Sequence, residues 1–83
     1  GELDEAEAAF HRAIELAPEL TDAHFELGVL REAQGDVQGA LECYARVVEL
    51  RPRSVEAHMQ MGLLLCENER LEEAIPHFQR AIE

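Results

Sequence analysis

The sequence repeats its own pattern at an offset of 34 residues, and this period limits the possible folds more than any other feature of the chain. Small, aromatic, branched and turn-forming residues all recur in columns at that offset. The columns are Ala6, Ala40 and Ala74; Phe10, Tyr44 and Phe78; Ala13, Val47 and Ala81; Ile14, Val48 and Ile82; Gly28 and Gly62; and Pro18 and Pro52. A period of this length is typical of a solenoid, in which each unit packs on the next.

The period divides the chain into one complete unit and parts of two others. Residues 21–54 form the complete unit, residues 1–20 supply the second helix of a unit cut before it, and residues 55–83 form a unit truncated at its C-terminal end. We therefore expect residues 1–83 to be a single domain of about 2.4 units. Solenoids need about three units for stability, so the sequence is expected to be a fragment of a longer array.

Apolar residues recur at helical spacing between the turn residues. The expected helices are residues 2–16, 21–34, 36–50, 55–68 and 71–83. Asp36 and Ser54 are placed to cap the third and fourth of these, and Gly35 to end the second with a positive φ. Pro76 should bend the fifth, because it removes one backbone hydrogen bond. Short turns make successive helices antiparallel, so we predict an all-α, antiparallel helix-turn-helix solenoid of five helices.

The spacing of the recurring residues resembles the tetratricopeptide repeat, which is marked by Trp, a Leu-Gly pair, Tyr, Ala, an aromatic residue and Pro. In the central unit these marks fall on His24, Leu27, Gly28, Arg31, Ala40, Tyr44 and Pro52. In the next unit they fall on His58, Met61, Gly62, Leu65, Ala74 and Phe78. His thus replaces the Trp, and Arg31 or Leu65 replaces the Tyr. The resemblance covers essentially the whole chain and implies that Gly28 faces Ala40, with Tyr44 filling the space beyond.

The resemblance also implies a concave groove lined by the first helix of each unit. The positions that fall on it are Asp22, Phe25, Glu26, Val29, Ala33, Glu56, Met59, Gln60, Leu63 and Glu67. Phe25, Val29, Met59 and Leu63 are apolar although they lie outside the packing columns, which indicates contact with another molecule. The other interpretation is that neighbouring units cover them.

A protein-interaction module that binds a peptide or helix in this groove is the function that the resemblance implies. Carboxylates at Asp22, Glu26, Glu56 and Glu67 surround the apolar positions, so the expected partner carries basic residues beside apolar ones. The alternative is a structural spacer or a self-association segment of a longer array. Self-association is expected because the first and last helices keep apolar faces that no further helix covers.

Several other classes of function are disfavoured by the composition. The chain has 18 acidic and 7 basic residues and a net charge of −11, which argues against binding to nucleic acid or an anionic membrane. No apolar run approaches the roughly 18 residues that a membrane-spanning helix needs. The sequence lacks HExxH, CxxC and Gly-rich phosphate-binding motifs, and short turns leave no room for a long catalytic loop. We therefore expect no enzyme activity, no cofactor and no metal.

The cysteines and histidines leave two questions open. Cys43 and Cys66 lack metal-type spacing and are expected to be reduced, which favours a cytoplasmic location. His24 and His58 occupy equivalent positions and could approach each other to bind a metal or sense pH; simple packing in the slot of the family's Trp is the other interpretation. His11 and His77 are expected on the polar sides of their helices.

Overall fold

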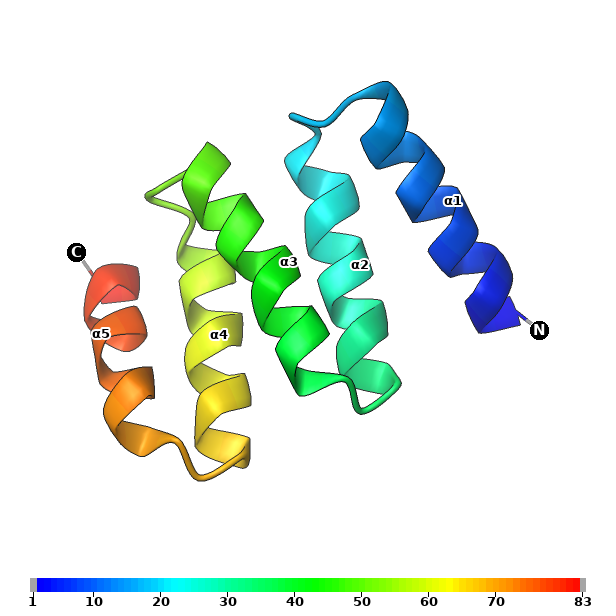
Figure 1. The fold of residues 1–83 in the computed structure, drawn as a ribbon. Coiled ribbons are helices and arrows are strands. Elements are labelled where there is room, and N and C mark those ends of the chain that lie inside the picture. Colours follow the sequence, from blue (N-terminus) through cyan, green and yellow to red (C-terminus); the bar gives the residue numbers. More distant parts are fainter. Residues whose placement is uncertain (1, 83) are drawn as a thin grey trace.

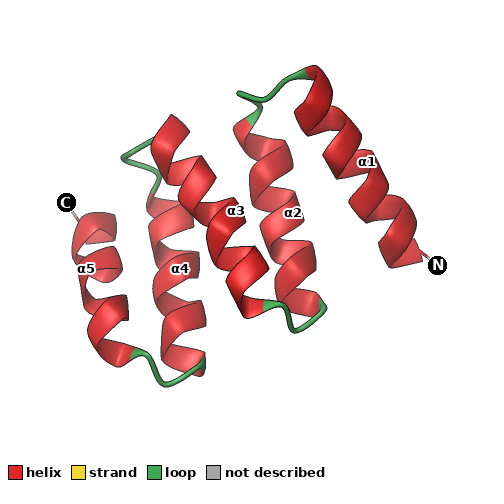
Figure 2. Cartoon of the chain, in the orientation of Figure 1, coloured by secondary structure: helices red, strands yellow, loops and turns green. Residues whose placement is uncertain are grey.

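The computed structural model describes residues 2–82 of the chain, and Figure 2 shows that helices joined by short turns make up this range. The helices are α1 (Glu2–Leu16), α2 (Thr21–Ala33), α3 (Val37–Leu50), α4 (Val55–Glu67) and α5 (Leu71–Ile82). Each agrees with the sequence-based expectation to within one residue, although the expected end of the last helix at residue 83 lies outside the described residues. Because residues 2–82 contain no strand, the predicted all-α fold is confirmed.

The helices stack side by side in chain order, and each runs antiparallel to the one before it (Figure 1). The described part of the chain is a slab with extents of 34 × 24 × 13 Å. The most extensive contacts are within the hairpins α2–α3 and α4–α5, while α1 on α2 and α3 on α4 contact each other less. This dependence on nearest neighbours is the packing expected of a solenoid.

Local side-chain signals set the helix ends as the sequence predicted. Asp36 caps α3 through Oδ1, which accepts a hydrogen bond of 2.9 Å from the Gly39 amide. Ser54 caps α4 through Oγ, which accepts one of 3.2 Å from the Ala57 amide. Such caps satisfy amides that the first turn of a helix leaves without partners.

The turn after α4 repeats the backbone of the turn after α2 without a glycine. Gly35 has a φ of 78°, and Glu69, 34 residues later, has a φ of 60°. In both turns the following amide donates to a carbonyl five residues earlier, at 2.9 and 2.8 Å. The geometry of the turn therefore requires a positive φ at this position, and the chain adopts it even where the residue is not glycine.

Buried apolar side chains come from α2, α3, α4 and α5, and one cluster of them lies between α3, α4 and α5. This core cluster consists of Ala40, Leu41, Tyr44, Met61, Leu64, Leu65 and Ala74. Tyr44 is its largest fully buried side chain, and the hydroxyl of Tyr44 donates a hydrogen bond to the carboxylate of Glu32. Burial first, and then this hydrogen bond, raise the pKa of Tyr44, so its hydroxyl stays protonated and hydrogen-bonded.

Gly28 lies against the ring of Tyr44, which the sequence placed in the space beside it, and its approach to Ala40 stays a prediction. A Cβ built on Gly28 would lie 2.6 Å from Cε1 of Tyr44, and one built on Gly62 would lie 2.6 Å from Cε1 of Phe78. Both distances are too short for real atoms. The two glycines therefore make room on one helix for an aromatic ring from the next, which offsets the cost of about 1 kcal/mol for glycine inside a helix.

The last helix contains a proline in its interior. α5 continues from Leu71 to Ile82 through Pro76, and the ring of Pro76 is exposed to solvent. Proline donates no backbone hydrogen bond, so one bond of the helix is missing there. The bend expected at this point stays a prediction.

Candidate functional site

All ten positions that the sequence assigned to the groove lie on α2 and α4. Most of them are exposed, namely Asp22, Glu26, Val29, Ala33, Glu56, Met59, Leu63 and Glu67. Phe25 and Gln60 are half-buried. The two first helices of the repeat therefore present both apolar and acidic side chains to the outside.

Three apolar side chains form what we call the apolar stripe: Val29, Met59 and Leu63. Their exposed fractions are 42%, 39% and 45%, which is high for large apolar residues on helices that also carry a buried face. Phe25 differs, because its ring lies 5.4 Å from that of Tyr44 at an angle of 53° and packs against the core. The sequence-based assignment of Phe25 to a position outside the internal packing was wrong. Its ring serves both the core and the outer surface.

A depression lies where the N-terminal ends of α2 and α4 meet the turn between α3 and α4. It consists of two adjoining hollows of about 830 and 170 Å³. The residues common to both are Asp22, Arg51, Ser54 and Glu56. Phe25 and Glu26 line the smaller hollow, so the depression is continuous with the surface that the sequence assigned to the groove.

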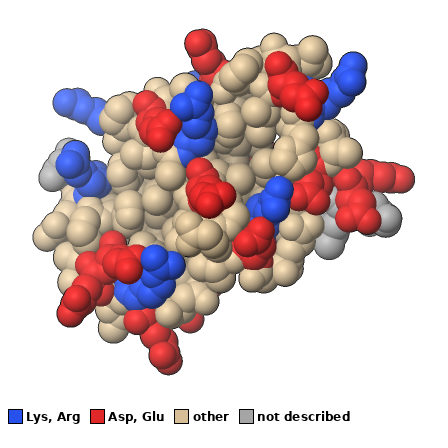
Figure 3. All heavy atoms as spheres, viewed as in Figure 1, with Lys and Arg blue, Asp and Glu red and all other residues tan. Residues whose placement is uncertain are grey.

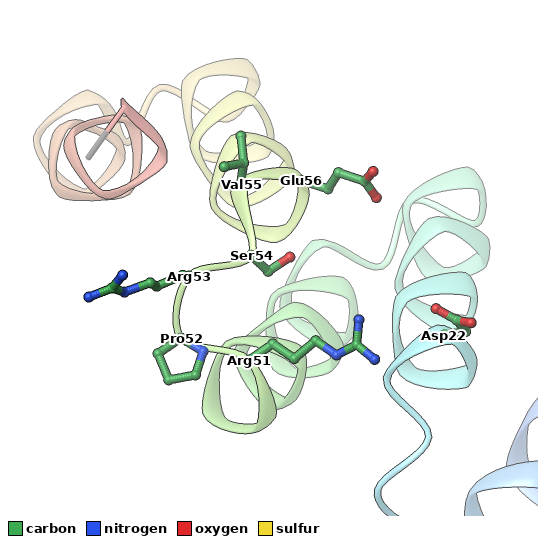
Figure 4. A pocket seen from close by; sticks show the side chains of 7 residues that line it. All are labelled: Asp22, Arg51, Pro52, Arg53, Ser54, Val55 and Glu56. Carbon is green, nitrogen blue, oxygen red and sulfur yellow. The ribbon is translucent and has the colours of Figure 1, made fainter.

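Arg51 reaches into this depression between carboxylates. In Figure 4 its guanidinium extends from the end of α3 toward Asp22 on α2, and Glu56 on α4 points into the same space, whereas Arg53 points the other way. Sequence reasoning missed Arg51, because Ala17 occupies the equivalent position one unit earlier and no column marks it. Its only signal was its place immediately before Pro52 in the turn.

The depression is negative despite Arg51. Three carboxylates, those of Asp22, Glu26 and Glu56, line the depression against the guanidinium groups of Arg51 and Arg53, of which only Arg51 extends toward Asp22 in Figure 4. Elsewhere acidic and basic side chains are interspersed, as on the face seen in Figure 3. A local excess of carboxylates in a hollow concentrates the negative potential of the whole chain.

The histidines in the Trp-equivalent slots are buried and make the same hydrogen bond in both units. Nε2 of His24 lies 3.0 Å from the carbonyl oxygen of Pro18, and Nε2 of His58 lies 3.0 Å from that of Pro52. A carbonyl only accepts, so Nε2 carries a proton in each ring. Both residues thus pack in the family's Trp slot and tie the start of a first helix to the preceding turn.

His58 also contacts His77, which the sequence placed on a polar surface. The Nδ1 atoms are 3.4 Å apart and the ring centroids 5.7 Å apart, and His77 is half-buried. Burial and then His58 lower the pKa of His77, against an opposing effect of Glu73. The column of His77 holds Cys43 in the preceding unit, so the period gave no sign of this pair.

Arg31, in the slot of the family's Tyr, fastens α1 to the rest of the molecule. Its Nη2 lies 2.7 Å from Oε1 of Glu7 and 3.3 Å from Nε2 of His11, while its Nη1 lies 3.2 Å from Oδ2 of Asp36. Nε of Arg31 is buried without a hydrogen-bond partner. At the position where the family pattern has Tyr, Arg31 thus links α1 to α2 through charged contacts.

The described residues hold neither a metal cluster nor a membrane-spanning helix. Residues 2–82 contain no group of three or more His, Cys, Asp or Glu side chains arranged to hold a metal ion. None of the helices described is both long and apolar enough to span a bilayer. Cys43 and Cys66 are free thiols.

Residues 2–82 form five antiparallel helices with a 34-residue period, and α2 and α4, the first helices of their units, carry exposed apolar and acidic side chains. These features define a helical-repeat scaffold, a class of protein that binds other proteins. The family model of the tetratricopeptide repeat matches residues 1–46 and again residues 31–83. The chain therefore belongs to the tetratricopeptide repeat family.

Solved structures of MamA have the same fold. One crystal structure of MamA aligns with a TM-score of 0.94 and 28% identity over 99% of this chain and 48% of the MamA chain. Another aligns with a TM-score of 0.92 and 28% identity over 99% of this chain and 45% of the other. The chain thus spans about half the length of these MamA chains. A search of curated proteins finds no match.

Proposed function

We propose that this chain is a binding module that receives a peptide or an amphipathic helix along α2 and α4. The observation that carries the proposal is the apolar stripe, since Val29, Met59 and Leu63 are exposed on helices whose other faces are buried in the core. Burial of one such side chain by a partner contributes about 1.5–3 kcal/mol.

The partner carries Lys or Arg beside Leu, Ile or Phe. Glu26 on α2 and Glu67 on α4 share these helices with the apolar stripe, and Asp22 and Glu56 line the depression. Carboxylates around an apolar contact attract a basic segment and repel an acidic one, and the attraction weakens as salt rises. The depression at the N-terminal ends of α2 and α4 offers room for one long basic side chain of the partner.

The proposed module is not an enzyme, and we place it in the cytoplasm. Among the described residues, the proposed groove and the depression offer carboxylates, apolar side chains and the arginines Arg51 and Arg53, without a nucleophile paired to a base. The cytoplasmic location is supported by the two free thiols and remains to be tested by imaging a tagged chain in its own cell.

Selection of peptides on the immobilised chain tests the proposal. We expect a random displayed library to yield peptides that combine Lys or Arg with Leu, Ile or Phe. Met59→Ala and Leu63→Ala should each weaken binding of the selected peptide by more than about 1 kcal/mol. The matched control is Ile75→Ala, because Ile75 is 54% exposed on α5, away from the groove. If the groove variants bind as tightly as the parent, the binding surface lies elsewhere.

Self-association is the second candidate, and the outer face of α5 favours it. Leu71, Ile75 and Ile82 on this helix are 60%, 54% and 85% exposed, and Leu16 at the end of α1 is 76% exposed. Copies that bury these faces against each other would remove a large apolar area from water. Light scattering over a range of concentrations tests this, and a strictly monomeric mass at high concentration would refute it. Ile75→Lys should reduce any oligomer without affecting the selected peptide.

A further inference from the structure

His58 and His77 bring two imidazole rings together between α4 and α5. Their Nδ1 atoms are 3.4 Å apart, and neither residue lines the depression or carries the apolar stripe. His58 is only 5% exposed, while His77 is half-buried and gives access from the surface. The two side chains come from neighbouring antiparallel helices, so the pair lies within the α4–α5 hairpin.

The proton on His58 is held at the far side of the ring. Nε2 donates to the carbonyl oxygen of Pro52 at 3.0 Å, so in the neutral ring Nδ1 carries a lone pair, which accepts a hydrogen bond of 3.4 Å from Nδ1 of His77. Histidines that bind metal ions have this arrangement: the nitrogen that does not bind the metal donates to a backbone carbonyl or a carboxylate, and the ring is oriented by that bond.

The spacing of the two Nδ1 atoms also suits a metal ion. Two nitrogens that bind one tetrahedral ion at about 2.0–2.1 Å lie about 3.3–3.4 Å from each other. The observed separation of 3.4 Å meets this requirement. The ring centroids are 5.7 Å apart, so the two rings lie nearly in line and must tilt before both lone pairs converge on one ion. His77 must also give up its hydrogen bond to His58 by transferring its proton from Nδ1 to Nε2 through solvent, a change of tautomer that leaves the ring neutral.

We propose that His58 and His77 chelate a divalent transition-metal ion, Zn²⁺ being the first to test, through their Nδ1 atoms. Imidazole is a suitable ligand for zinc and its neighbours in the first transition row. Since the described residues supply no third ligand, water or a group from a bound partner fills the remaining positions. This differs from the expectation of no metal, which rested on sequence motifs and could not detect ligands from two helices.

The surroundings of the pair carry little charge of their own. Glu73 on α5 interacts electrostatically with His77, but its carboxylate also pairs with Arg70 at 2.5 Å.

The preceding unit provides an internal comparison, because His24 makes the same carbonyl bond while Cys43 replaces His77. Burial raises the pKa of the Cys43 thiol, which disfavours the thiolate that a metal would need.

Calorimetric titration of the intact chain, free of any histidine tag, with ZnCl₂ tests the proposal. One Zn²⁺ should bind per chain, and the dissociation constant should rise at least tenfold in His58→Gln and in His77→Gln. His24→Gln is the matched control, because it removes the equivalent carbonyl bond without touching the pair, and His11→Gln controls for an exposed imidazole. Both controls should bind Zn²⁺ as the parent does.

A second measurement separates metal binding from unfolding. Zn²⁺ should raise the melting temperature of the parent and of His24→Gln but not that of His77→Gln, whose circular dichroism spectrum should match the parent. The proposal is overturned if the parent shows no saturable Zn²⁺ binding, or if folded His77→Gln binds as tightly as the parent. Equal weakening in His11→Gln would assign the ion to scattered surface groups and would overturn it as well.

Discussion

Glu69 adopts the same left-handed backbone as Gly35, with φ values of 60° and 78°, although only one of the two residues lacks a Cβ. Their turns lie 34 residues apart and make the same return hydrogen bond to the end of the preceding helix. A residue with a side chain is strained in this conformation, by roughly 1–2 kcal/mol. The turn at Glu69 therefore carries a backbone strain energy that the turn at Gly35 does not.

Glu69→Gly should accordingly stabilise the chain. We expect a gain of about 0.5–1 kcal/mol, since the relief of strain is partly offset by the greater entropy of unfolded glycine. The reverse change, Gly35→Glu, should destabilise by a similar amount. Urea unfolding followed by circular dichroism measures both, and equal stabilities for Glu69→Gly and the parent would contradict the argument.

The contact between Gly62 and Phe78 predicts an effect opposite to helix propensity. Gly62→Ala would normally stabilise a helix by about 1 kcal/mol, but here the new Cβ meets the ring of Phe78 at 2.6 Å. We expect a net loss of about 1–3 kcal/mol. In the double variant with Phe78→Leu, Gly62→Ala should cost much less, and a double-mutant cycle in urea will show whether the two changes are coupled. Strict additivity would mean that the ring does not lie on the glycine.

The cap of α3 predicts a specific dependence on pH. The backbone hydrogen bond from Gly39, aided by Arg31, holds the pKa of Asp36 below its ordinary value of 3.8. A carboxylate with a lowered pKa stabilises the fold fully above its unfolded pKa, and this contribution is lost as pH falls through the lower folded value. Asp36→Asn keeps a capping oxygen without the charge. The stability difference between parent and Asp36→Asn should therefore stay constant above about pH 5 and shrink as pH falls through 3.8 and then through the lower folded pKa; a difference that stays constant over the whole range would contradict this.

Phe25 should affect both folding and binding. Its half-buried ring packs on Tyr44, so Phe25→Ala should destabilise by about 1–2 kcal/mol, less than the 3–5 kcal/mol typical of a fully buried phenylalanine. It should also weaken binding of the selected peptide. Val29→Ala is the matched comparison, because it should weaken binding with little effect on thermal unfolding. Equal melting temperatures for Phe25→Ala and Val29→Ala would exclude the shared role.

Arg51 and Arg53 offer a test of the charge in the depression. Arg51→Ala removes the positive charge among three carboxylates, so a basic peptide should bind more tightly, by about two- to fivefold at low salt. Arg53→Ala should have little effect, since that side chain points away from Asp22 and Glu56 (Figure 4). Fluorescence anisotropy at two salt concentrations measures both variants. Weaker binding by Arg51→Ala would mean that Arg51 itself contacts the partner.

Much of the fold could be predicted from sequence, because a repeated pattern reports the same structure more than once. The helices, the caps at Asp36 and Ser54 and the positive φ of Gly35 follow from backbone needs that specific residue types meet. The exposed positions of α2 and α4 followed from the family resemblance. That these positions bind a partner remains a prediction.

What could not be predicted depends on single residues and on side-chain reach. His77 has Cys43 as its counterpart and Arg51 has Ala17, so comparison between units hides both. Glu69 contradicts the usual residue type for its backbone conformation. The closeness of the Tyr44 ring to Gly28 arises because a long side chain from the next helix extends over the glycine, a direction that column spacing does not encode.

The uneven packing between successive helices decides what joins the two hairpins. Contacts within α2–α3 and within α4–α5 are more extensive than those between α3 and α4, but buried side chains of one core cluster lie on both sides of the α3–α4 junction. A ligand that spans α2 and α4 contacts both hairpins, so any change in how they are placed relative to each other enters directly into the affinity of the complex.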